Sequence, residues 1–279
     1  MNVSRNVWPG ATTITFTSLN DSEARAQLAR ADWEVCVELR GRVALVTGGG
    51  RRVGRALAVG LGAQGMRVAI HYHASDKGAR ETARLVAEAG GTPWVVAADL
   101  TSDVAPNDLV TAVIEEFGSL DVLVNSSAVM ERTPLGEVTA AQWDAVMALN
   151  LRAPFLLAQA AAPHLARSHG AIVNIADLAA FETWPAYIPH GISKAGIVYM
   201  TRALARTLAP NVRVNGVAPG AVLLPEGWTA GDAAKLEEST PLARLGSPED
   251  VVEAVLYLLR ADYVTGETLI VDGGRHVRR

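Results

Sequence analysis

Val43-Ala44-Leu45-Val46-Thr47-Gly48-Gly49-Gly50-Arg51-Arg52-Val53-Gly54 is the stretch of this sequence that decides its fold. A short apolar run leads into a glycine-rich turn, and helical spacing begins directly after it. Glycine lets a backbone pass close to a pyrophosphate, and a helix N-terminus supplies N–H groups and positive potential. The stretch therefore predicts a strand, a phosphate-binding loop and a helix. The alternative is a tight strand–helix turn that binds nothing, and the βαβ context favours the cofactor loop.

Apolar runs alternate with helical spacing along the rest of the chain. The expected strands are Val43–Val46, Val68–Ile70, Trp94–Ala97, Val122–Val124, Ala171–Ile175, Val212–Val217 and Thr268–Val271, and examples of the helices between them are Arg55–Gln64, Gly78–Ala89 and Leu109–Phe117. Most of the runs are continuous rather than alternating, as expected of parallel strands covered on both faces. The pattern predicts an α/β fold, a Rossmann-type doubly wound parallel sheet of seven strands in a single domain.

Two segments differ from this pattern. Residues 1–38 are rich in Thr, Ser, Asn and Arg, and we expect a poorly ordered N-terminal extension, with a short helix at 22–34 as the alternative. The folded domain then covers residues 39–279. Within it, residues 221–247 form a long connection with several glycines and prolines. That connection is typical of a substrate lid that carries a short helix.

The bulk composition excludes several classes of protein. The chain has 279 residues, 49% of them hydrophobic, and a net charge of −4, which favours a globular protein over a nucleic-acid-binding one. The single cysteine, Cys36, excludes an internal disulfide and leaves no cysteine cluster for zinc. We expect no metal site, no membrane-spanning helix and a cytoplasmic location.

The motifs resemble those of the short-chain dehydrogenase/reductase family, over residues 39–274. The family loop Thr-Gly-x-x-x-Gly-x-Gly is matched by residues 47–54, with Arg52 at the second glycine position. This arginine, residues 71–75 (His-Tyr-His-Ala-Ser) and Asp177 in place of the family's serine are similar to the pteridine reductase branch. The resemblance implies a Rossmann fold, a nicotinamide cofactor and an oxidoreductase.

The charges near the second expected strand indicate which nicotinamide cofactor binds. Sites for NAD place an acidic residue near the end of this strand to hold the ribose hydroxyls, and residues 69–75 contain none. Arg51 or Arg52, with His73 and Ser75, could instead receive a 2′-phosphate, to which a guanidinium is well suited. We therefore predict NADP(H). The alternative is that both arginines are solvated residues at a helix start.

The resemblance also implies the other cofactor contacts. Asp99 and Leu100 follow the third strand and correspond to the pair that contacts adenine, and Asn125 corresponds to the first residue of the family's Asn-Asn-Ala-Gly segment. The remaining implied contacts are Gly48, Val53 and Gly54 at the phosphates, Lys194 at the ribose, and Pro219, Gly220 and Val222 at the nicotinamide.

The reaction centre departs from the family pattern at one residue. In the family, an Asn, a Ser, a Tyr and a Lys cooperate, and these positions correspond to Asn150, Asp177, His190 and Lys194. His190 thus stands in the place of the proton-donating tyrosine. His190 and Lys194 are four residues apart, so they share one side of a helix.

The chemistry of this centre leaves three alternatives open. A neutral imidazole is a poor acid, so His190 must be an imidazolium to protonate a substrate; Lys194 disfavours that state, whereas an ionised Asp177 favours it. In the first alternative, Asp177 and His190 act as one coupled acid pair on a nitrogen-containing substrate. In the second, Asp177 acts with a water while His190 only positions the substrate. The third alternative is a catalytically silent site.

The substrate pocket carries a weaker signal. Pteridine reductases stack their substrate on an aromatic ring after the fourth strand, where this chain has Met130. Three other aromatic residues, Trp184, Tyr187 and Trp228, could line the pocket instead. The alternative is that they pack in the core or in the lid. We expect an NADPH-dependent oxidoreductase that transfers hydride to a C=N or C=O bond of a small cyclic, pteridine-like substrate. The alternative is an NADP-binding pseudoenzyme that acts as a sensor or assembly subunit. The resemblance also implies a homodimer or homotetramer through helices near residues 142–165 and 190–208.

Overall fold

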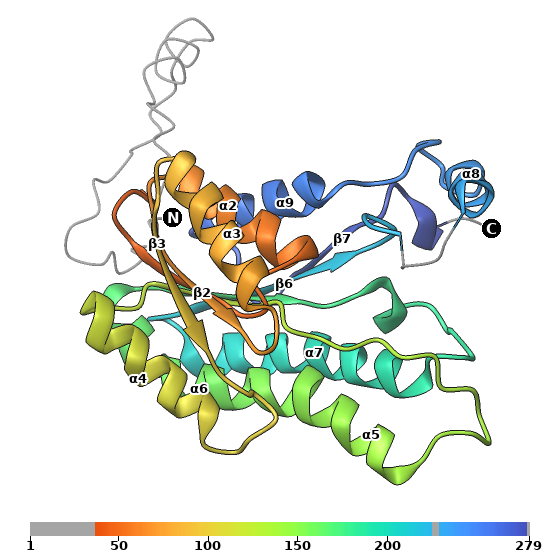
Figure 1. Cartoon of the computed structure of the whole chain (residues 1–279), viewed down its shortest axis with the longest axis horizontal. Coiled ribbons are helices and arrows are strands. Elements are labelled where there is room, and N and C mark those ends of the chain that lie inside the picture. Colours follow the sequence, from red (N-terminus) through yellow and green to blue (C-terminus); the bar gives the residue numbers. More distant parts are fainter. Residues whose placement is uncertain (1–36, 225–228, 278–279) are drawn as a thin grey trace, which may run out of the picture. The chain divides into compact units, whose positions relative to one another are not determined.

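Seven parallel strands form one sheet in the order β3-β2-β1-β4-β5-β6-β7 in the computed structural model, which describes residues 37–224 and 229–277 (Figure 1). The strands are β1 Val43–Val46, β2 Arg67–Tyr72, β3 Thr92–Ala97, β4 Val122–Asn125, β5 Ala171–Ile175, β6 Arg213–Pro219 and β7 Thr268–Val271. This confirms the single-domain, doubly wound seven-stranded sheet. The expectations for residues 1–36, the short helix at 22–34 included, and for Trp228 lie outside the described residues.

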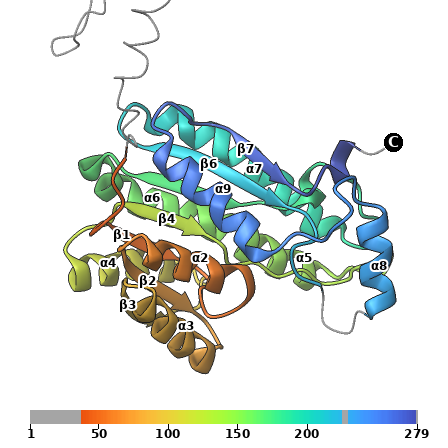
Figure 2. The same cartoon turned by 90° about the horizontal axis from the view of Figure 1, so that it is seen from above.

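Helices cover both faces of this sheet (Figures 1 and 2). One face carries α2 (Arg52–Ala63), α3 (Asp76–Glu88) and α9 (Pro248–Arg260), and the other carries α4 (Ala105–Phe117), α5 (Ala140–Met147), α6 (Ala153–Ser168) and α7 (Ile188–Leu208). The connection after β6 contains α8 (Ala230–Glu238), so a short helix lies where the lid was expected.

The strands are buried on both faces, which explains their unbroken apolar runs. In β1, Ala44 and Val46 belong to the core under α2, α3 and α9, whereas Val43 and Leu45 belong to the core under α4 and α6. All four are fully buried. A strand with both faces covered cannot show the apolar–polar alternation of a half-exposed strand.

The helices begin earlier than their apolar spacing suggested. The α2 helix begins at Arg52 rather than at Arg55, and α4 begins at Ala105 rather than at Leu109. First turns are rich in glycine, proline and polar residues, because their N–H groups have no partner within the helix. An apolar period therefore misses the first turn.

One helical stretch in the described part of the chain is long and apolar enough to span a bilayer by length and composition alone. It runs over Ala140–Ser168 and combines α5, a π-helical turn (Ala148–Arg152) and α6. The side chains of Leu157, Ala161 and Leu165 are buried in the core against the sheet. The α6 portion is therefore a core helix of the α/β fold.

The strand order places the site. The chain leaves β1 toward one side of the sheet and β4 toward the other, so a crevice opens at the carboxyl ends of these two strands. Ligands of doubly wound sheets bind in such a crevice. The glycine-rich loop follows β1, and Asp177 and the start of α7 follow β5 on the same edge of the sheet.

Candidate active site

The loop after β1 has the shape of a phosphate cradle. Gly48 has a φ of +67°, and a Cβ at Gly54 would lie 2.2 Å from the Gly48 carbonyl oxygen, so neither position tolerates a side chain. The N-cap of α2 is Arg51, which makes no side-chain capping bond. The first N–H groups of α2 therefore face the crevice as donors for an anion, and the loop fits a dinucleotide pyrophosphate.

Arg52 has a strained backbone and reaches across the crevice. Its φ is +51°, which is unusual for a residue other than glycine. Its guanidinium donates to the carbonyl oxygen of Leu223 at 3.3 Å and to that of Leu224 at 3.4 Å. The structure thus directs Arg52 toward the segment after β6, while Arg51 remains exposed.

The end of β2 presents no free carboxylate from residues 69–75. His73 is exposed and Ser75 is the N-cap residue of α3. The next residue, Asp76, accepts hydrogen bonds from the Tyr72 hydroxyl and from Arg80, both at 2.9 Å. Arg80 and Tyr72 together hold the pKa of Asp76 below its usual range. The first acid after β2 is therefore engaged by one residue of that strand and one of its own helix.

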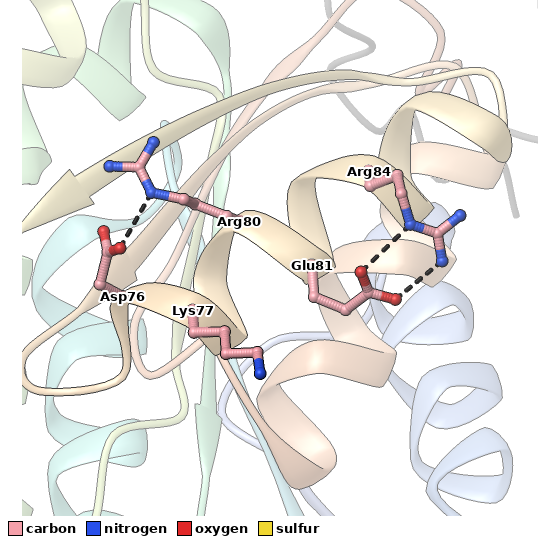
Figure 3. Close-up of a pocket in the computed structure, with 5 residues that line it drawn as sticks. All are labelled: Asp76, Lys77, Arg80, Glu81 and Arg84. Atoms are coloured by element: carbon pink, nitrogen blue, oxygen red, sulfur yellow. Dashed lines mark hydrogen bonds and ion pairs between the residues drawn. The ribbon is translucent and has the colours of Figure 1, made fainter.

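A shallow depression on α3 lies apart from the reaction chemistry (Figure 3). Its lining is made of charged residues of one helix, Asp76, Lys77, Arg80, Glu81 and Arg84. The carboxylate of Glu81 pairs with Arg84 at 2.7 Å across its floor. Exposed pairs three or four residues apart support a helix only weakly. We interpret this depression as a solvated helix face.

Three of the expected cofactor residues, Asp99, Leu100 and Asn125, lie at the ends of β3 and β4. Asp99 accepts from the backbone N–H and the hydroxyl of Thr101, and Leu100 is buried. The Asn125 side chain donates to Asn174 Oδ1 at 2.9 Å, and its own Oδ1 is buried without a hydrogen-bond partner. The Asn125 side chain thus belongs to the interior of the sheet.

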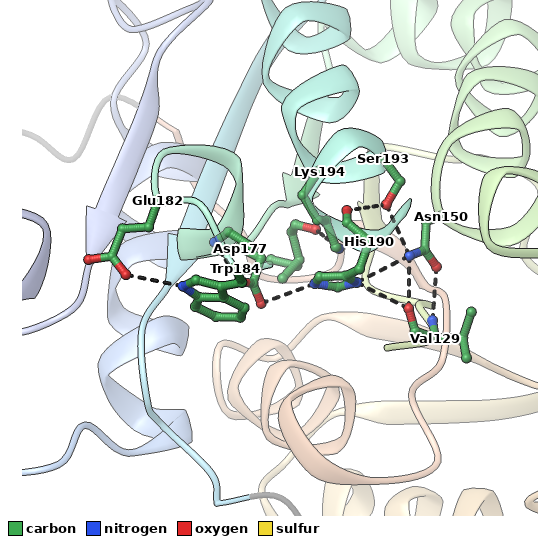
Figure 4. Close-up of polar contacts among 10 residues, drawn as sticks. Val129, Asn150, Asp177, Glu182, Trp184, His190, Ser193 and Lys194 are labelled. Atoms are coloured by element: carbon green, nitrogen blue, oxygen red, sulfur yellow. Dashed lines mark hydrogen bonds and ion pairs between the residues drawn. The ribbon is translucent and has the colours of Figure 1, made fainter. Parts of the chain in front are cut away.

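Four polar side chains expected at the reaction centre lie together in the structure (Figure 4). Asp177 follows β5 and caps a short 3-10 turn (Leu178–Ala180) by accepting from the Ala179 N–H. His190 and Lys194 come from the first turns of α7, and Asn150 comes from the π-helical turn before α6. His190 Nε2 lies 3.6 Å from Asp177 Oδ2, and His190 Nδ1 lies 3.4 Å from Asn150 Nδ2.

The hydrogen bonds around His190 define its tautomer. The two amide hydrogens of Asn150 are taken by the Val129 carbonyl at 2.9 Å and by the Ser193 hydroxyl at 3.1 Å. His190 Nδ1 lies 3.2 Å from the same Val129 carbonyl oxygen. A carbonyl can only accept, so Nδ1 carries the proton and donates to it. In a neutral imidazole, Nε2 is then an acceptor.

In this tautomer, His190 Nε2 is an acceptor that receives no hydrogen bond and faces Asp177. His190 is 3% exposed, and its Nε2 has no hydrogen-bond partner. The Asp177 carboxylate oxygen Oδ2 lies 3.6 Å from Nε2 and is also an acceptor. Two facing acceptors repel each other, whereas one proton between them would satisfy both. The pair thus joins a buried imidazole to a carboxylate that is 25% exposed.

Lys194 lies beside the pair with its ammonium group almost removed from water. The residue is 5% exposed, and its Nζ donates to the carbonyl oxygen of Ile175 at 2.8 Å. Burial lowers the pKa of Lys194 to about 8, and the negative charge of Asp177 opposes that shift. The pKa of Lys194 thus lies only slightly above neutral pH.

Sequence reasoning missed Ser193 and the backbone of Val129. The Ser193 hydroxyl donates to the His190 carbonyl oxygen at 2.6 Å and accepts from Asn150. Asn150 Oδ1 accepts from the Val129 N–H at 2.8 Å. Ser193 lies between His190 and Lys194 in the chain, but a hydroxyl one residue before the lysine carries no recognisable signal. The backbone of Val129 carries none at all.

An aromatic wall borders the reaction centre. The Trp184 indole donates to Glu182 at 3.2 Å, and its ring stands edge-on to Tyr187 with centroids 6.3 Å apart. Figure 4 shows Trp184 on the Asp177 side of His190. Met130 follows Val129 and is 42% exposed. Three of the four residues expected at the substrate therefore lie around His190. Trp184 lies on its Asp177 side, Tyr187 precedes it by three residues, and Met130 follows Val129, whose carbonyl group contacts the imidazole.

The segment after β6 completes the crevice. A Cβ on Gly220 would lie 2.7 Å from the Cβ of Asp272, so the chain passes very close to the end of β7 here. Pro219 is the last residue of β6, and Val222 is buried. Within residues 37–224 and 229–277, no group of three or more His, Cys, Asp and Glu side chains is placed to hold a metal ion.

Comparison with known proteins defines the class of this site. The family model described as "Enoyl-(Acyl carrier protein) reductase" matches residues 49–276. A Streptomyces violaceoruber protein named as ketoacyl reductase 2 of the granaticin polyketide synthase is 39% identical over 84% of this chain and 96% of its own length. The 3beta-hydroxysteroid dehydrogenase 1 of Eggerthella lenta is 35% identical over 85% and 94%.

Solved structures agree with this result. A Sinorhizobium meliloti protein described as a short-chain alcohol dehydrogenase superposes with a TM-score of 0.82 at 34% identity, covering 87% of this chain and 99% of its own. The chain therefore belongs to the short-chain dehydrogenase/reductase family. Members are oxidoreductases that use nicotinamide cofactors, act on small molecules and are typically oligomeric.

Proposed function

We propose that this chain is an NADP(H)-dependent reductase in which Asp177 and His190 together supply the proton that a tyrosine supplies elsewhere in the family. The observation that carries the proposal is the buried, unpartnered Nε2 of His190 at 3.6 Å from the Asp177 carboxylate. A pair that holds a single proton beside a substrate is a usable general acid. The chemistry is hydride transfer to a C=N or C=O carbon of a small cyclic, pteridine-like substrate.

Each side chain of the reaction centre has a separate role in this proposal. The bound nicotinamide supplies the hydride, which leaves the substrate nitrogen or oxygen in need of one proton. The proton held between His190 Nε2 and Asp177 moves to that atom, and Asp177 then faces a neutral imidazole until solvent restores the proton. Asn150 and the Val129 carbonyl hold the imidazole ring in place. Lys194 would hold the ribose of a bound cofactor, and its ammonium group would stabilise the developing negative charge.

The cofactor assignment rests on the phosphate cradle and on local charge. Gly48, Val53 and Gly54 leave the α2 N-terminus open to the pyrophosphate. We assign a 2′-phosphate to Arg51, Arg52, His73 and Ser75, because the first acid after β2, Asp76, is engaged by Arg80. The remaining assignments are Asp99 and Leu100 at the adenine, Lys194 at the ribose, and Pro219, Gly220 and Val222 at the nicotinamide. We also assign Asn125, at the end of β4, to the cofactor site.

The substrate class follows from the wall of the site and from the relatives. Trp184 and Tyr187 present flat apolar surfaces beside the acid pair, with Met130 next to them, and such surfaces suit a ring. The relatives named above are a ketoacyl reductase and a hydroxysteroid dehydrogenase, which favours a carbonyl or hydroxyl carbon. Residues 221–247, with α8, would close over the ring as a lid.

A second candidate function is an NADP-binding pseudoenzyme that senses the cofactor or supports an assembly. One observation favours it: His190 Nδ1, Asn150 and Lys194 are all bonded to backbone carbonyl groups, as they would be in a site kept only for its structure. The exposed apolar side chains of α5, α6 and α7 suit a homodimer or homotetramer in either case. They are Trp143, Phe155, Ile192 and Tyr199.

The test is NADPH oxidation by the purified protein with dihydropterins, cyclic imines and cyclic ketones, beside binding of NADPH and NADH. We expect turnover with at least one ring substrate. The variant Asp177→Asn should lose about 100-fold or more in kcat and still bind NADPH, because an amide cannot share the proton with His190. The matched control is Asp108→Asn, which makes the same change at an exposed carboxylate on α4.

The variant His190→Tyr separates the two candidate functions. Turnover by the native protein that is lost in Asp177→Asn supports the acid pair. A silent native protein whose His190→Tyr variant reduces the same substrates would favour the pseudoenzyme. Tighter binding of NADH than of NADPH would overturn the cofactor assignment, whichever reaction is found.

A further inference from the structure

His71, in the middle of the crevice wall, has no part in the chemistry proposed above. It lies on β2, is 2% exposed and is fully enclosed between the loop after β1 and the end of β3. A buried histidine is costly unless both ring nitrogens have partners. Both nitrogens of His71 have one, and the two partners belong to different loops.

The first partner is the phosphate loop. The Gly48 N–H donates to His71 Nδ1 at 3.1 Å, and the Gly49 N–H donates to the His71 carbonyl oxygen at 2.9 Å. An acceptor at Nδ1 requires that this nitrogen carry no proton. The backbone and the side chain of one residue therefore hold two successive N–H groups of the glycine-rich loop.

The second partner is the segment that leads to the adenine. His71 Nε2 lies 3.1 Å from the carbonyl oxygen of Ala98, the residue before Asp99. Because Nδ1 is an acceptor, Nε2 carries the proton and donates it to this carbonyl. The ring is thus a neutral imidazole with one defined tautomer. Burial lowers the pKa of His71 to about 4, which keeps it in that form throughout the neutral range.

The opposite side of Gly48 is also fixed. A Cβ on Gly48 would lie 3.0 Å from the Ser127 hydroxyl oxygen, so the loop touches the segment after β4. Thr47 Oγ1 accepts from the N–H groups of Ser126 and Ser127 at 2.9 and 3.0 Å. The position of the phosphate loop is therefore set by His71 on one side and by Thr47 on the other.

We propose that His71 is a positioning residue for the dinucleotide: its imidazole sets the separation between the phosphate loop and the adenine segment, so that both ends of one cofactor are bound together. The proposal rests on the proposed binding of NADP(H), and it adds a residue with no contact to the reacting atoms. Because the Gly48 N–H already donates to the imidazole, the pyrophosphate would be held by the first N–H groups of α2.

Three substitutions separate the two hydrogen bonds. In His71→Asn, the side-chain oxygen can replace Nδ1 as the acceptor for Gly48, and in His71→Gln the amide nitrogen can replace Nε2 as the donor to Ala98. The variant His71→Leu retains neither bond. We expect NADPH to bind about 10-fold more weakly to His71→Leu and about 3-fold more weakly to His71→Asn, with His71→Gln between them. The matched control is His164→Leu on α6, which should bind as the native protein does.

The readout is calorimetric binding of NADPH, which gives the affinity and the bound fraction separately and needs no turnover. A positioning role weakens the affinity while each folded molecule still binds one NADPH. A purely structural role reduces the bound fraction and leaves the affinity of the remainder unchanged, which would overturn the proposal. Equal affinities of His71→Leu and the native protein would also overturn it.

The failure of this inference can be distinguished from the failure of the proposed function. Native protein that binds NADPH without any turnover removes the reductase proposal and leaves the His71 series interpretable. Turnover of a ring substrate with unchanged affinity in His71→Leu removes only the role of His71. A native protein that binds neither NADPH nor NADH would overturn both.

Discussion

Two buried imidazoles, one on each side of the crevice, have opposite relations to their surroundings. His71, on the cofactor side, donates from one nitrogen and accepts at the other, both at 3.1 Å. His190, on the substrate side, donates from Nδ1 and leaves Nε2 without a partner, facing a carboxylate at 3.6 Å. Both residues are at most 3% exposed. Burial alone therefore does not distinguish a positioning histidine from a reactive one; the number of satisfied nitrogens does.

The same contrast extends to the two sides of the crevice. The phosphate loop is held by neutral groups and backbone hydrogen bonds that need no change of protonation to bind a ligand. The substrate side gathers Asp177, His190 and Lys194, with His190 3.6 Å from Asp177 and the pKa of Lys194 lowered by burial and partly restored by Asp177. A rigid neutral cradle suits a cofactor that must always bind in the same place, and coupled titrating groups suit proton transfer.

The largest effect expected from this contrast is on stability against pH. The pKa of His71 is about 4 in the folded protein, against an ordinary value of 6.5, with burial as the main cause and the nearby His73 as a smaller one. Between these values the unfolded chain binds the proton and the folded chain does not. Unfolding free energy should therefore fall by about 3 kcal/mol from pH 6.5 to pH 4 through this residue alone, and stay level above pH 6.5.

The measurement is urea unfolding at several pH values, for the native protein and His71→Asn. The asparagine variant should lose this part of the pH dependence and keep the part due to other groups. The His71 ring resonances in an NMR titration provide an independent check that needs no variant. A midpoint for His71 near its ordinary value would contradict the assigned tautomer and its hydrogen bonds.

The second expected effect tests the substrate side through Lys194. Its buried ammonium group has one backbone acceptor, so the variant Lys194→Met removes a desolvated charge at the cost of leaving the Ile175 carbonyl unpaired. We expect the variant to be more stable than the native protein by about 1–2 kcal/mol at pH 7, and inactive. A site kept for function rather than for stability behaves in this way.

The sign of the pH dependence sharpens the Lys194 prediction. The folded protein releases the Lys194 proton near pH 8, whereas the unfolded chain retains it up to its ordinary pKa of 10.5. The native protein therefore gains stability relative to the variant as pH rises from 8 to 10.5. Thermal unfolding at pH 7 and pH 9.5 should show a smaller difference at the higher pH. An equal difference at both pH values would mean that Lys194 is not desolvated as the structure implies.

Most of the fold could be predicted from the sequence, because parallel strands that are buried on both faces have continuous apolar sequences. β1, β5 and β7 begin and end at the residues that their runs predicted. The four-residue spacing of His190 and Lys194 predicted that they share a helix face, and the resemblance to the family implied that Asp177 lies beside them. The roles of Val129 and His71 could not be predicted, because a backbone carbonyl or N–H group has no signature in the sequence.

The contacts and the backbone conformation of Arg52 also could not be predicted from the sequence. Its position in the loop was visible in the sequence, but its contacts to Leu223 and Leu224 join residues 171 and 172 positions apart. The sequence also gave no sign of its left-handed backbone, because an arginine rarely adopts a positive φ. A glycine, which the family has at this position, can adopt it without strain. The substitution of that glycine by an arginine thus adds strain that only the structure reveals.

The smallest expected effect is the release of this strain. At a φ of +51°, the variant Arg52→Gly should stabilise the protein by about 0.5–1 kcal/mol, since the exposed contacts to Leu223 and Leu224 are long and add little. The matched variant Arg52→Ala keeps the strained backbone and should show no gain. The pair isolates the backbone term at one position, and chemical unfolding with and without NADPH measures both. If the glycine variant is more stable alone but gains less from NADPH than the native protein does, then Arg52 is retained for the cofactor. Equal stability of the glycine and alanine variants would instead show that residue 52 carries no backbone strain.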